Sequence, residues 1–231
     1  MTVLATVFPL VCWFAYNYGV PLIERRRPSL SVIMSLQRRR WVANMAGRET
    51  PLDAILSGNL MSSISFLAST TVLMILAIFA ALGQIPALVT TLRTAGIGPT
   101  FAAGDLQLHF VVMLAIFVLA FFAFTLALRQ FNHFCIMIGA MDHSRPATEA
   151  EIDAIASLNT MAARNFNNGI RAYYFSVATV AWFIADWAAI AASLVVVAVL
   201  IHREFFSSAH RVAASAALSA RRQEQPAPAE R

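Results

Sequence analysis

Four long apolar stretches, separated by polar segments, dominate the pattern of the chain. They cover residues 3–23, 51–82, 108–128 and 172–201. At a rise of about 1.5 Å per residue, some 20 apolar residues are enough to cross the roughly 30 Å hydrocarbon core of a bilayer. The pattern therefore predicts an all-α polytopic membrane protein with four transmembrane helices and long cytoplasmic helix extensions.

The last apolar stretch, 172–201, contains a single charged residue, Asp186, near its middle. As part of one transmembrane helix, Asp186 would lie close to the bilayer midplane, where an ionised carboxylate costs roughly 2.5–3.5 kcal/mol. We therefore expect its side chain to face protein or water, with Asn17, Thr70 and Thr71 as neighbours at the same depth. It serves either as a proton- or cation-coupled site or as a protonated acid that is hydrogen-bonded within the bundle.

A polar stripe follows the second apolar helix at spacings of three and four residues, which places its members on one helical face. The expected role is packing against another helix, where small residues allow close approach; the alternative is the lining of a hydrated path. Its members are Asn59, Ser62, Ser65 and Ser69. Together with Asp186, Asn17 and Thr70, the residues Asn59 and Ser69 form our candidate intramembrane polar site.

The first polar segment, 24–48, carries seven arginines beside an apolar span. Basic residues in short loops favour the cytoplasmic side, so we expect the loop 24–53 to be cytoplasmic. Residues 31–45 are expected to form an amphipathic helix lying on the membrane. The arginines either capture anionic lipid headgroups, at about 1 kcal/mol per Arg near the surface, or only set the topology.

The third polar segment begins a second amphipathic helix at about 149–167, because Thr148 and Glu151 have the spacing of a capping box. The run from Asn165 to Gly169 predicts a bend before the last span. Acidic residues near the helix start, with His133 and His143, have the chemistry of a metal site, but a solvated helix start explains them better. We predict no metal and no cofactor.

Polar and basic residues from two helices are expected near one level at the inner membrane surface. They are candidates for an anion or lipid-headgroup pocket, the alternative being topology charges and helix caps. The candidate residues are Arg129, Asn132, His133, Arg164, Asn168 and Arg171.

Topology follows from the distribution of arginine, since the chain has no lysine. The three loops and the tail contain seven, one, four and five arginines in order. Four spans place loops one and three inside and both termini outside, although the arginines of the tail oppose this. We expect a single transmembrane domain, 1–207, and a partly disordered tail, 208–231, in the inner membrane of a bacterium.

Composition supports the membrane assignment. Hydrophobic residues make up 59% and charged residues 13% of the chain, against roughly 45–50% and 25% in soluble domains. The net charge of +5 does not indicate nucleic-acid binding, because the arginines flank apolar spans. Metal-binding, phosphate-binding and nucleophile motifs are missing from the sequence, so we do not expect an enzyme.

Several segments resemble the domain-of-unknown-function-599 membrane proteins of bacteria and plants. The similar segments are NLMSSISFLASTTVLMILAIFAALG, LRQFNHFCIMIGAM, NFNNGIRAYYFSVATVAWF and VVVAVLIHREFFS. The resemblance covers about 38–207 and implies a membrane architecture but no activity. The family positions that it implies are Asn59, Ser69, Thr70, Arg129, Asn132, Gly169, Arg171, Tyr173, Tyr174, Trp182, Arg203, Glu204 and Phe205.

Two functions from different classes are consistent with this pattern. The first is an oligomeric channel or transporter for an ion or small solute, since four spans are few for a monomeric transporter. The second is a structural or accessory subunit that binds anionic lipid or a larger membrane complex. Small residues such as Ala181, Ala185 and Ala189 offer a close-packing face for either association. We expect membrane lipid, a second copy of the chain and possible membrane-protein partners to bind.

Overall fold

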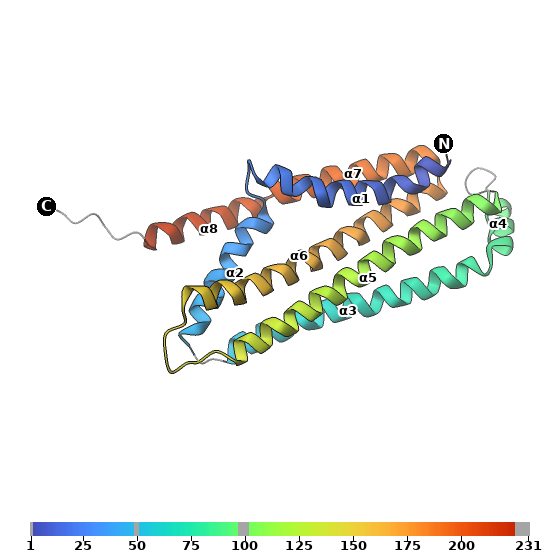
Figure 1. Ribbon diagram of the computed structural model, residues 1–231. Helices are drawn as coiled ribbons and strands as arrows, with labels where there is room; N and C mark the ends of the chain where they lie inside the picture. The colour runs from blue at the N-terminus through green and yellow to red at the C-terminus, as the bar shows by residue number, and fades with distance from the viewer. Residues whose placement is uncertain (1, 49–50, 97–101, 225–231) are drawn as a thin grey trace.

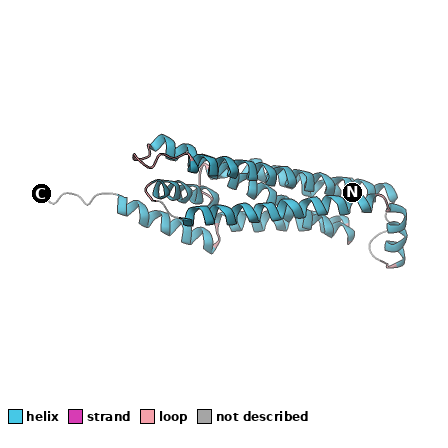
Figure 2. Ribbon diagram, turned by 90° about the horizontal axis from the view of Figure 1, so that it is seen from below, coloured by secondary structure: helices cyan, strands magenta, loops and turns pink. Residues whose placement is uncertain are grey.

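The computed structural model describes residues 2–48, 51–96 and 102–224, and these residues form one elongated bundle of helices (Figures 1 and 2). Every regular element in the described part of the chain is helical, which confirms the prediction of an all-α polytopic fold. The helices are α1 (Thr2–Glu24), α2 (Leu30–Ala46), α3 (Pro51–Leu82), α4 (Ile85–Thr94), α5 (Ala103–Gly139), α6 (Glu149–Val180), the short 3-10 helix η1 (Ala181–Phe183), α7 (Asp186–Phe205) and α8 (Ser208–Glu224).

The antiparallel pair α5 and α6 forms the centre of the bundle (Figure 1). Helix α3 packs on the side of α5, whereas α1 and α7 pack on α6 and on each other. Aromatic residues fill the main core, and Phe124, Phe134 and Phe175 are fully buried there. Such large apolar side chains stabilise the pairing of long helices because each buries extensive surface.

Four helical segments are long and apolar enough to cross a membrane: Val3–Glu24, Pro51–Leu82, Ala103–Gly139 and Asp186–Ser219. The predicted number is therefore confirmed. The fourth segment differs from the predicted stretch 172–201, because the structure divides that stretch. Helix α6 ends at Val180, η1 turns the chain, and α7 returns beside α1 (Figure 1).

The division of 172–201 corrects the placement of Asp186. This residue is half-buried and is the first residue of α7, so it lies next to the turn and not in the middle of a helix. A carboxylate in the first turn of a helix interacts favourably with the positive end of the helix dipole. The turn contains neither Pro nor Gly. Ala185 instead adopts extended backbone angles, with φ −169° and ψ 156°.

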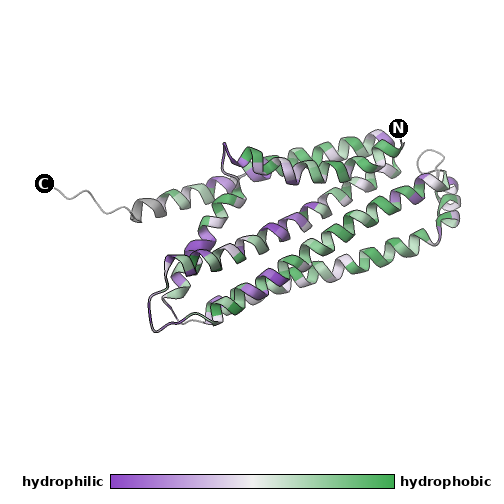
Figure 3. Ribbon diagram, viewed as in Figure 1, coloured by the Kyte–Doolittle hydropathy of each residue, from purple (hydrophilic) through white to green (hydrophobic). Residues whose placement is uncertain are grey.

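Helix α6 also differs from its prediction at the Asn-rich run. The helix continues without interruption from Glu149 through Gly169 to Val180, so the expected bend is absent. The capping box of Thr148 and Glu151 is present as predicted. The first half of α6 is polar and extends beyond α1 and α7, whereas its second half lies beside both helices (Figures 1 and 3).

The first and last described helices, α1 and α8, reach opposite ends of the bundle. The start of α1 is at the same end as α4 and the turn after α6, whereas α8 extends from the other end (Figure 1). The structure contains no membrane, so the expectation that both termini lie outside stays a prediction. The helical part of the predicted tail is α8, while residues 225–231 lie outside the described residues.

Candidate functional site: an arginine-lined cleft

Two adjoining cavities lie where α1 ends and α2 begins, against the middle of α6 and the end of α7. Their volumes are about 220 and 180 Å³, and both are lined by Ser31, Asn167 and Arg171. We call these cavities together the arginine cleft. Its charged residues are Glu24, Arg38, Arg164, Arg171, Arg203 and Glu204.

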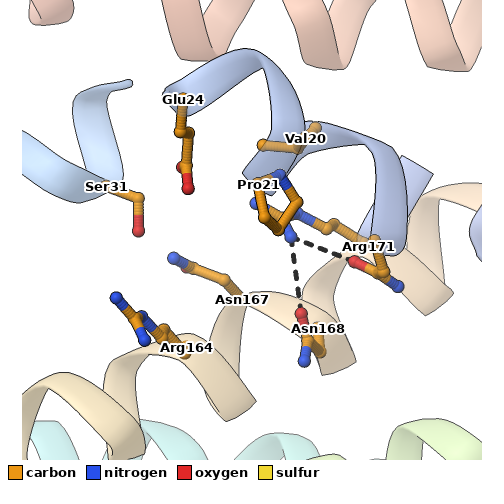
Figure 4. Close-up of a pocket in the computed structure, with 9 residues that line it drawn as sticks. Val20, Pro21, Glu24, Ser31, Arg164, Asn167, Asn168 and Arg171 are labelled. Atoms are coloured by element: carbon orange, nitrogen blue, oxygen red, sulfur yellow. Dashed lines mark hydrogen bonds between the residues drawn. The ribbon is translucent and has the colours of Figure 1, made fainter. Parts of the chain in front are cut away.

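Uncharged polar side chains hold Arg171 in place. Its Nη1 atom donates hydrogen bonds to Oδ1 of Asn17 at 3.0 Å and of Asn168 at 3.4 Å, as Figure 4 shows for Asn168. The guanidinium carbon lies 5.0 Å from the centre of the Tyr16 ring, which is a cation–π contact. These contacts orient the guanidinium but leave its positive charge uncompensated, because they include no carboxylate.

Arg38 and Arg164 are also without a carboxylate partner. Within the described part of the chain, neither side chain forms an ion pair or a hydrogen bond. Burial lowers the pKa of the Arg38 guanidinium, and the positive charge of Arg164 lowers this pKa further. Arginine remains protonated in proteins, so each of the two adjoining cavities has one of these positive charges in its lining. An anion between them would relieve the repulsion.

The acidic residues of the cleft hold the first turn of α2. Glu204 accepts a hydrogen bond from the backbone N–H of Ser31 at 3.0 Å. Glu24 accepts one from the hydroxyl of Ser29 at 2.5 Å, and this hydroxyl in turn accepts from the N–H of Val32 at 3.2 Å. The orphan N–H groups at a helix start need such acceptors. The two carboxylates therefore fix α2 against the cleft.

The structure brings together three of the six residues predicted for the inner-surface pocket. Arg164, Asn168 and Arg171 line the cleft together. Arg129, Asn132 and His133 do not: they are exposed on α5 and line none of the cavities found among the described residues. The reason is helical phase. The faces of α5 that meet other helices carry Phe131 and Phe134, so the polar residues between these two point away.

The predicted intramembrane polar site is not assembled within the chain. Asn59 and Ser69 are exposed on α3, and the hydroxyl of Thr70 bonds to the carbonyl of Phe66 in its own helix. Asp186 lies at the start of α7, and Asn17 belongs to the arginine cleft.

A neighbouring threonine makes the contact between helices instead. The hydroxyl of Thr71 lies 2.8 Å from that of Tyr173, joining α3 to α6. Thr71 is buried at this contact, whereas the sequence suggested it as a neighbour of Asp186.

The residues of the cleft that were not among the predicted site residues include Glu24, Ser31, Arg38 and Glu204. A signal existed for the first two, because Ser29 has the position of an N-cap before an apolar run and Glu24 is the acid closest to it. No signal separates Arg38 from its neighbours Arg39 and Arg40 in the sequence. Only the fold shows that Arg38 faces the cleft.

The acidic residues around the start of α6 are bound to arginine. Arg39 pairs with Glu149 and with Asp153, the latter at 2.6 Å. Arg145 pairs with Glu151 at 2.5 Å. Among the described residues, no three His, Cys, Asp or Glu side chains are grouped in a way that suits a metal ion. These ion pairs account for the acidic cluster and attach α2 to the first turns of α6.

The fold and the cleft define a class: a polytopic helical membrane protein with a basic cleft where helices α1 and α7 end. The chain belongs to the family described as "Protein of unknown function, DUF599", whose family model matches residues 4–209. This confirms the family resemblance of the sequence. No curated protein and no solved structure matches the chain.

Proposed function

We propose that the protein binds a phosphate-bearing headgroup in the arginine cleft. The observation that carries this proposal is that Arg38, Arg164 and Arg171 line connected cavities without a carboxylate partner. Arginine binds phosphate through charge-assisted, often bidentate hydrogen bonds. A further donor is available, because Nδ2 of Asn17 is buried and has no partner among the described residues.

The depth of the cleft in the bundle suits a lipid headgroup. The cleft lies where α1 and α7, two of the apolar helices, come to their polar ends. A phosphate at this level stays close to the position that it has in the bilayer. Each arginine near the surface contributes about 1 kcal/mol to the attraction of anionic lipid.

The test of this function is lipid binding by native mass spectrometry in mild detergent. We expect retained phospholipid on the unmodified protein, and a loss of most of it in Arg164→Gln. The matched control is Arg129→Gln, which removes an exposed arginine of α5 outside the cleft. Equal lipid retention by Arg164→Gln and Arg129→Gln would contradict the proposed function.

We further propose that the chain crosses the membrane five times, once more than the number of long apolar helices, and that the cleft lies on the cytoplasmic side. The second half of α6 lies beside α1 and α7 and supplies the additional crossing. This topology places the arginine-rich segment 24–48, the α5–α6 loop and α8 on one side. The arginines of the tail then obey the positive-inside rule. With four crossings they oppose it.

A second candidate function is a channel or transporter made of several copies. It is favoured by the polar stripe of α3, because Asn59, Ser62, Ser65 and Ser69 are all exposed in the single chain. A polar stripe that faces lipid is stabilised when it packs against another helix. In a ring of copies, the same stripe could line a hydrated path for an ion or small solute.

Cross-linking in the native membrane distinguishes this second candidate. In a background without Cys12 and Cys135, Ser62→Cys is expected to give disulfide-linked dimers. The matched control is Ser63→Cys, an exposed serine about 100° further around the same helix. Failure of Ser62→Cys to cross-link above Ser63→Cys would contradict association through the stripe and remove the support for a channel.

A further inference from the structure

The arginine cleft holds charges of both signs that do not pair with each other. Glu24 and Glu204 line it together with four arginines. Among the described residues, neither carboxylate has a basic group within the 4.0 Å of an ion pair. Opposite charges that line one cavity without touching leave room for a ligand that carries both signs.

The two signs lie on different walls of the first cavity. Glu24 and Ser31 come from the end of α1 and the start of α2, whereas Arg164 and Asn167 come from α6. Figure 4 shows these four side chains directed into a common space. A ligand in that space meets carboxylate and hydroxyl oxygens on one wall and guanidinium and amide N–H groups on the other.

The acidic wall and the basic wall of the cavity are each held by their own hydrogen bonds. One oxygen of Glu24 is bound by the Ser29 hydroxyl, and Arg171 is bound by Asn17 and Asn168. A carboxylate has two oxygens and about four acceptor sites, so Glu24 retains acceptor capacity towards the cleft. The cleft is thus prepared to accept N–H donors at one wall and to donate to an anion at the other.

Resting on the proposed function, we propose that the headgroup is zwitterionic: a phosphate linked through a short carbon chain to a primary ammonium. The phosphate lies against Arg164 and Arg171, and the ammonium donates to Glu24. Phosphoethanolamine, free or as a lipid headgroup, has this chemistry. An anionic headgroup without an ammonium, such as phosphoglycerol, offers Glu24 only neutral hydroxyl donors, which form weaker hydrogen bonds to a carboxylate than an ammonium does.

A quaternary ammonium does not fit the same wall. It has no N–H to donate, and proteins bind such groups on open aromatic faces. The ring of Tyr16 is already covered by Arg171, and the hydroxyl of Tyr174 accepts a hydrogen bond from Arg203 at 2.7 Å. We therefore expect the cleft to discriminate between ethanolamine and choline headgroups on identical acyl chains.

The experiment compares three lipids of the same acyl chains, with ethanolamine, choline or glycerol headgroups, titrated onto the full-length protein and followed by native mass spectrometry. The ethanolamine lipid is expected to bind about tenfold more tightly than either of the others, the effect of about one charge-assisted hydrogen bond. Glu24→Gln, which can still accept from Ser29, is expected to abolish this preference. Asp105→Asn, at the opposite end of the bundle, is the control and is expected to retain it.

The outcomes separate this inference from the proposed function. Tightest binding of the glycerol lipid, or equal binding of the ethanolamine and choline lipids, would overturn the primary-ammonium ligand but keep a phosphate site, provided that Arg164→Gln weakens binding. Binding that is unaffected by Arg164→Gln would overturn both. The comparison of lipids on the unmodified protein decides the inference even if Glu24→Gln does not fold.

Soluble O-phosphoethanolamine identifies the source of the headgroup. Its displacement of the ethanolamine lipid supports recognition of the headgroup alone, and therefore a free solute as ligand. A failure to displace at millimolar concentration, with the lipid preference intact, supports the same chemistry presented by a lipid.

Discussion

Gly169 of α6 lies directly against the ring of Phe124 of α5. A Cβ atom at Gly169 would be 2.5 Å from Cε1 and 2.7 Å from Cζ of this ring, distances at which atoms overlap. Phe124 is fully buried, with Phe166 and Tyr173 beside it at ring-centre distances of 6.0 and 5.8 Å. The ring therefore has little room to move, and the absence of a side chain at Gly169 sets the approach of the two central helices.

Gly169→Ala is accordingly expected to destabilise the protein. Overpacking of a filled core costs typically about 1–3 kcal/mol, which exceeds the gain in helix propensity of up to about 1 kcal/mol from replacing glycine. The measurement is the thermal unfolding temperature in detergent. Phe124→Leu, combined with Gly169→Ala, is expected to recover part of the loss.

Gly58→Ala is the matched control for this prediction. Gly58 lies inside α3, is exposed, and would place a Cβ in open space. Its replacement is expected to leave stability unchanged or to raise it slightly, since alanine is the better helix former. If Gly169→Ala behaved in the same way as Gly58→Ala, the close contact with Phe124 would not limit the packing of α5 and α6.

Asp53 joins two helices in a way that a first-turn acid alone does not require. It is 5% exposed and accepts hydrogen bonds from Nε1 of Trp41 at 2.6 Å and from Nη2 of Arg48 at 2.8 Å. Asp53→Asn is expected to cost roughly 1–3 kcal/mol, because hydrogen bonds to a charged acceptor are weakened. The Arg48 side chain is 39% exposed, so its ion pair contributes little. Thermal unfolding measures the loss.

Asp105→Asn tests whether the position of the acid in its helix explains the loss of stability expected for Asp53→Asn. Asp105 is also the third residue of its helix, α5, but its carboxylate has no hydrogen-bond partner among the described residues. Removing its charge is expected to cost only the helix-dipole contribution, about 0.3–1 kcal/mol. Equal losses in the two variants would show that the contacts of Asp53 to Trp41 and Arg48 do not stabilise the junction of α2 and α3.

The first turn of α6 is expected to depend on pH through Glu151. A hydrogen bond from Arg145, then those from the N–H and hydroxyl of Thr148, lower the pKa of Glu151 from 4.5 to about 2. The charged form therefore stabilises the folded cap above pH 4.5, and this contribution is lost as the pH falls through about 2. The protection of the amides of this turn against hydrogen exchange, relative to the intrinsic rate at each pH, should fall over that interval.

Glu151→Gln provides the comparison at neutral pH. The amide cannot pair with Arg145 as an anion, so the first turn of α6 is expected to be as weakly protected at pH 7, relative to intrinsic exchange, as the unmodified turn is near pH 2. Its exchange should also lose the pH dependence that Glu151 causes, once intrinsic exchange rates are corrected for. A turn that keeps its protection in Glu151→Gln would show that Thr148 alone caps the helix.

The periodic signals in the sequence were sufficient for most of the helices. The apolar pattern predicted α3 to the residue and the continuation of the third span as one long helix, α5. The capping box at Thr148 predicted the start of α6. These signals are local. They depend on apolar periodicity and on the few residues at a helix end, so they can be recognised in the sequence alone.

The turn between α6 and α7 is the main feature that the pattern did not reveal. Both of its arms are apolar and no Pro or Gly marks it, so 172–201 has the composition of a single span. Asp186 was the available signal, because an acid within an apolar run is as typical of a helix start as of a buried site. The cleft was predicted only for Arg164, Asn168 and Arg171, since its other wall comes from distant parts of the chain.

Because the last apolar stretch is divided, the five-crossing topology and the single-span topology place two residues differently relative to the membrane. With five crossings, Ile184 lies in the turn at the outer end of the bundle and Ser208 lies on the cytoplasmic side. Both side chains are exposed in the structure. With one continuous helix over 172–201, a residue at 184 would be embedded in lipid and a residue at 208 would be outside.

Single cysteines in a background without Cys12 and Cys135 test the five crossings in intact cells. We expect an impermeant thiol reagent to label Ile184→Cys and Ala95→Cys from outside, and to label Ser208→Cys and Ser144→Cys only after the membrane is opened. Ala95 and Ser144 are the controls, since both topologies place these loops on the same sides. Labelling of Ser208→Cys from outside would contradict the five crossings and remove the arginine cleft from the cytoplasmic leaflet. Protection of Ile184→Cys under all conditions would show that the turn after α6 is buried in the membrane, because the reagent needs an aqueous thiolate.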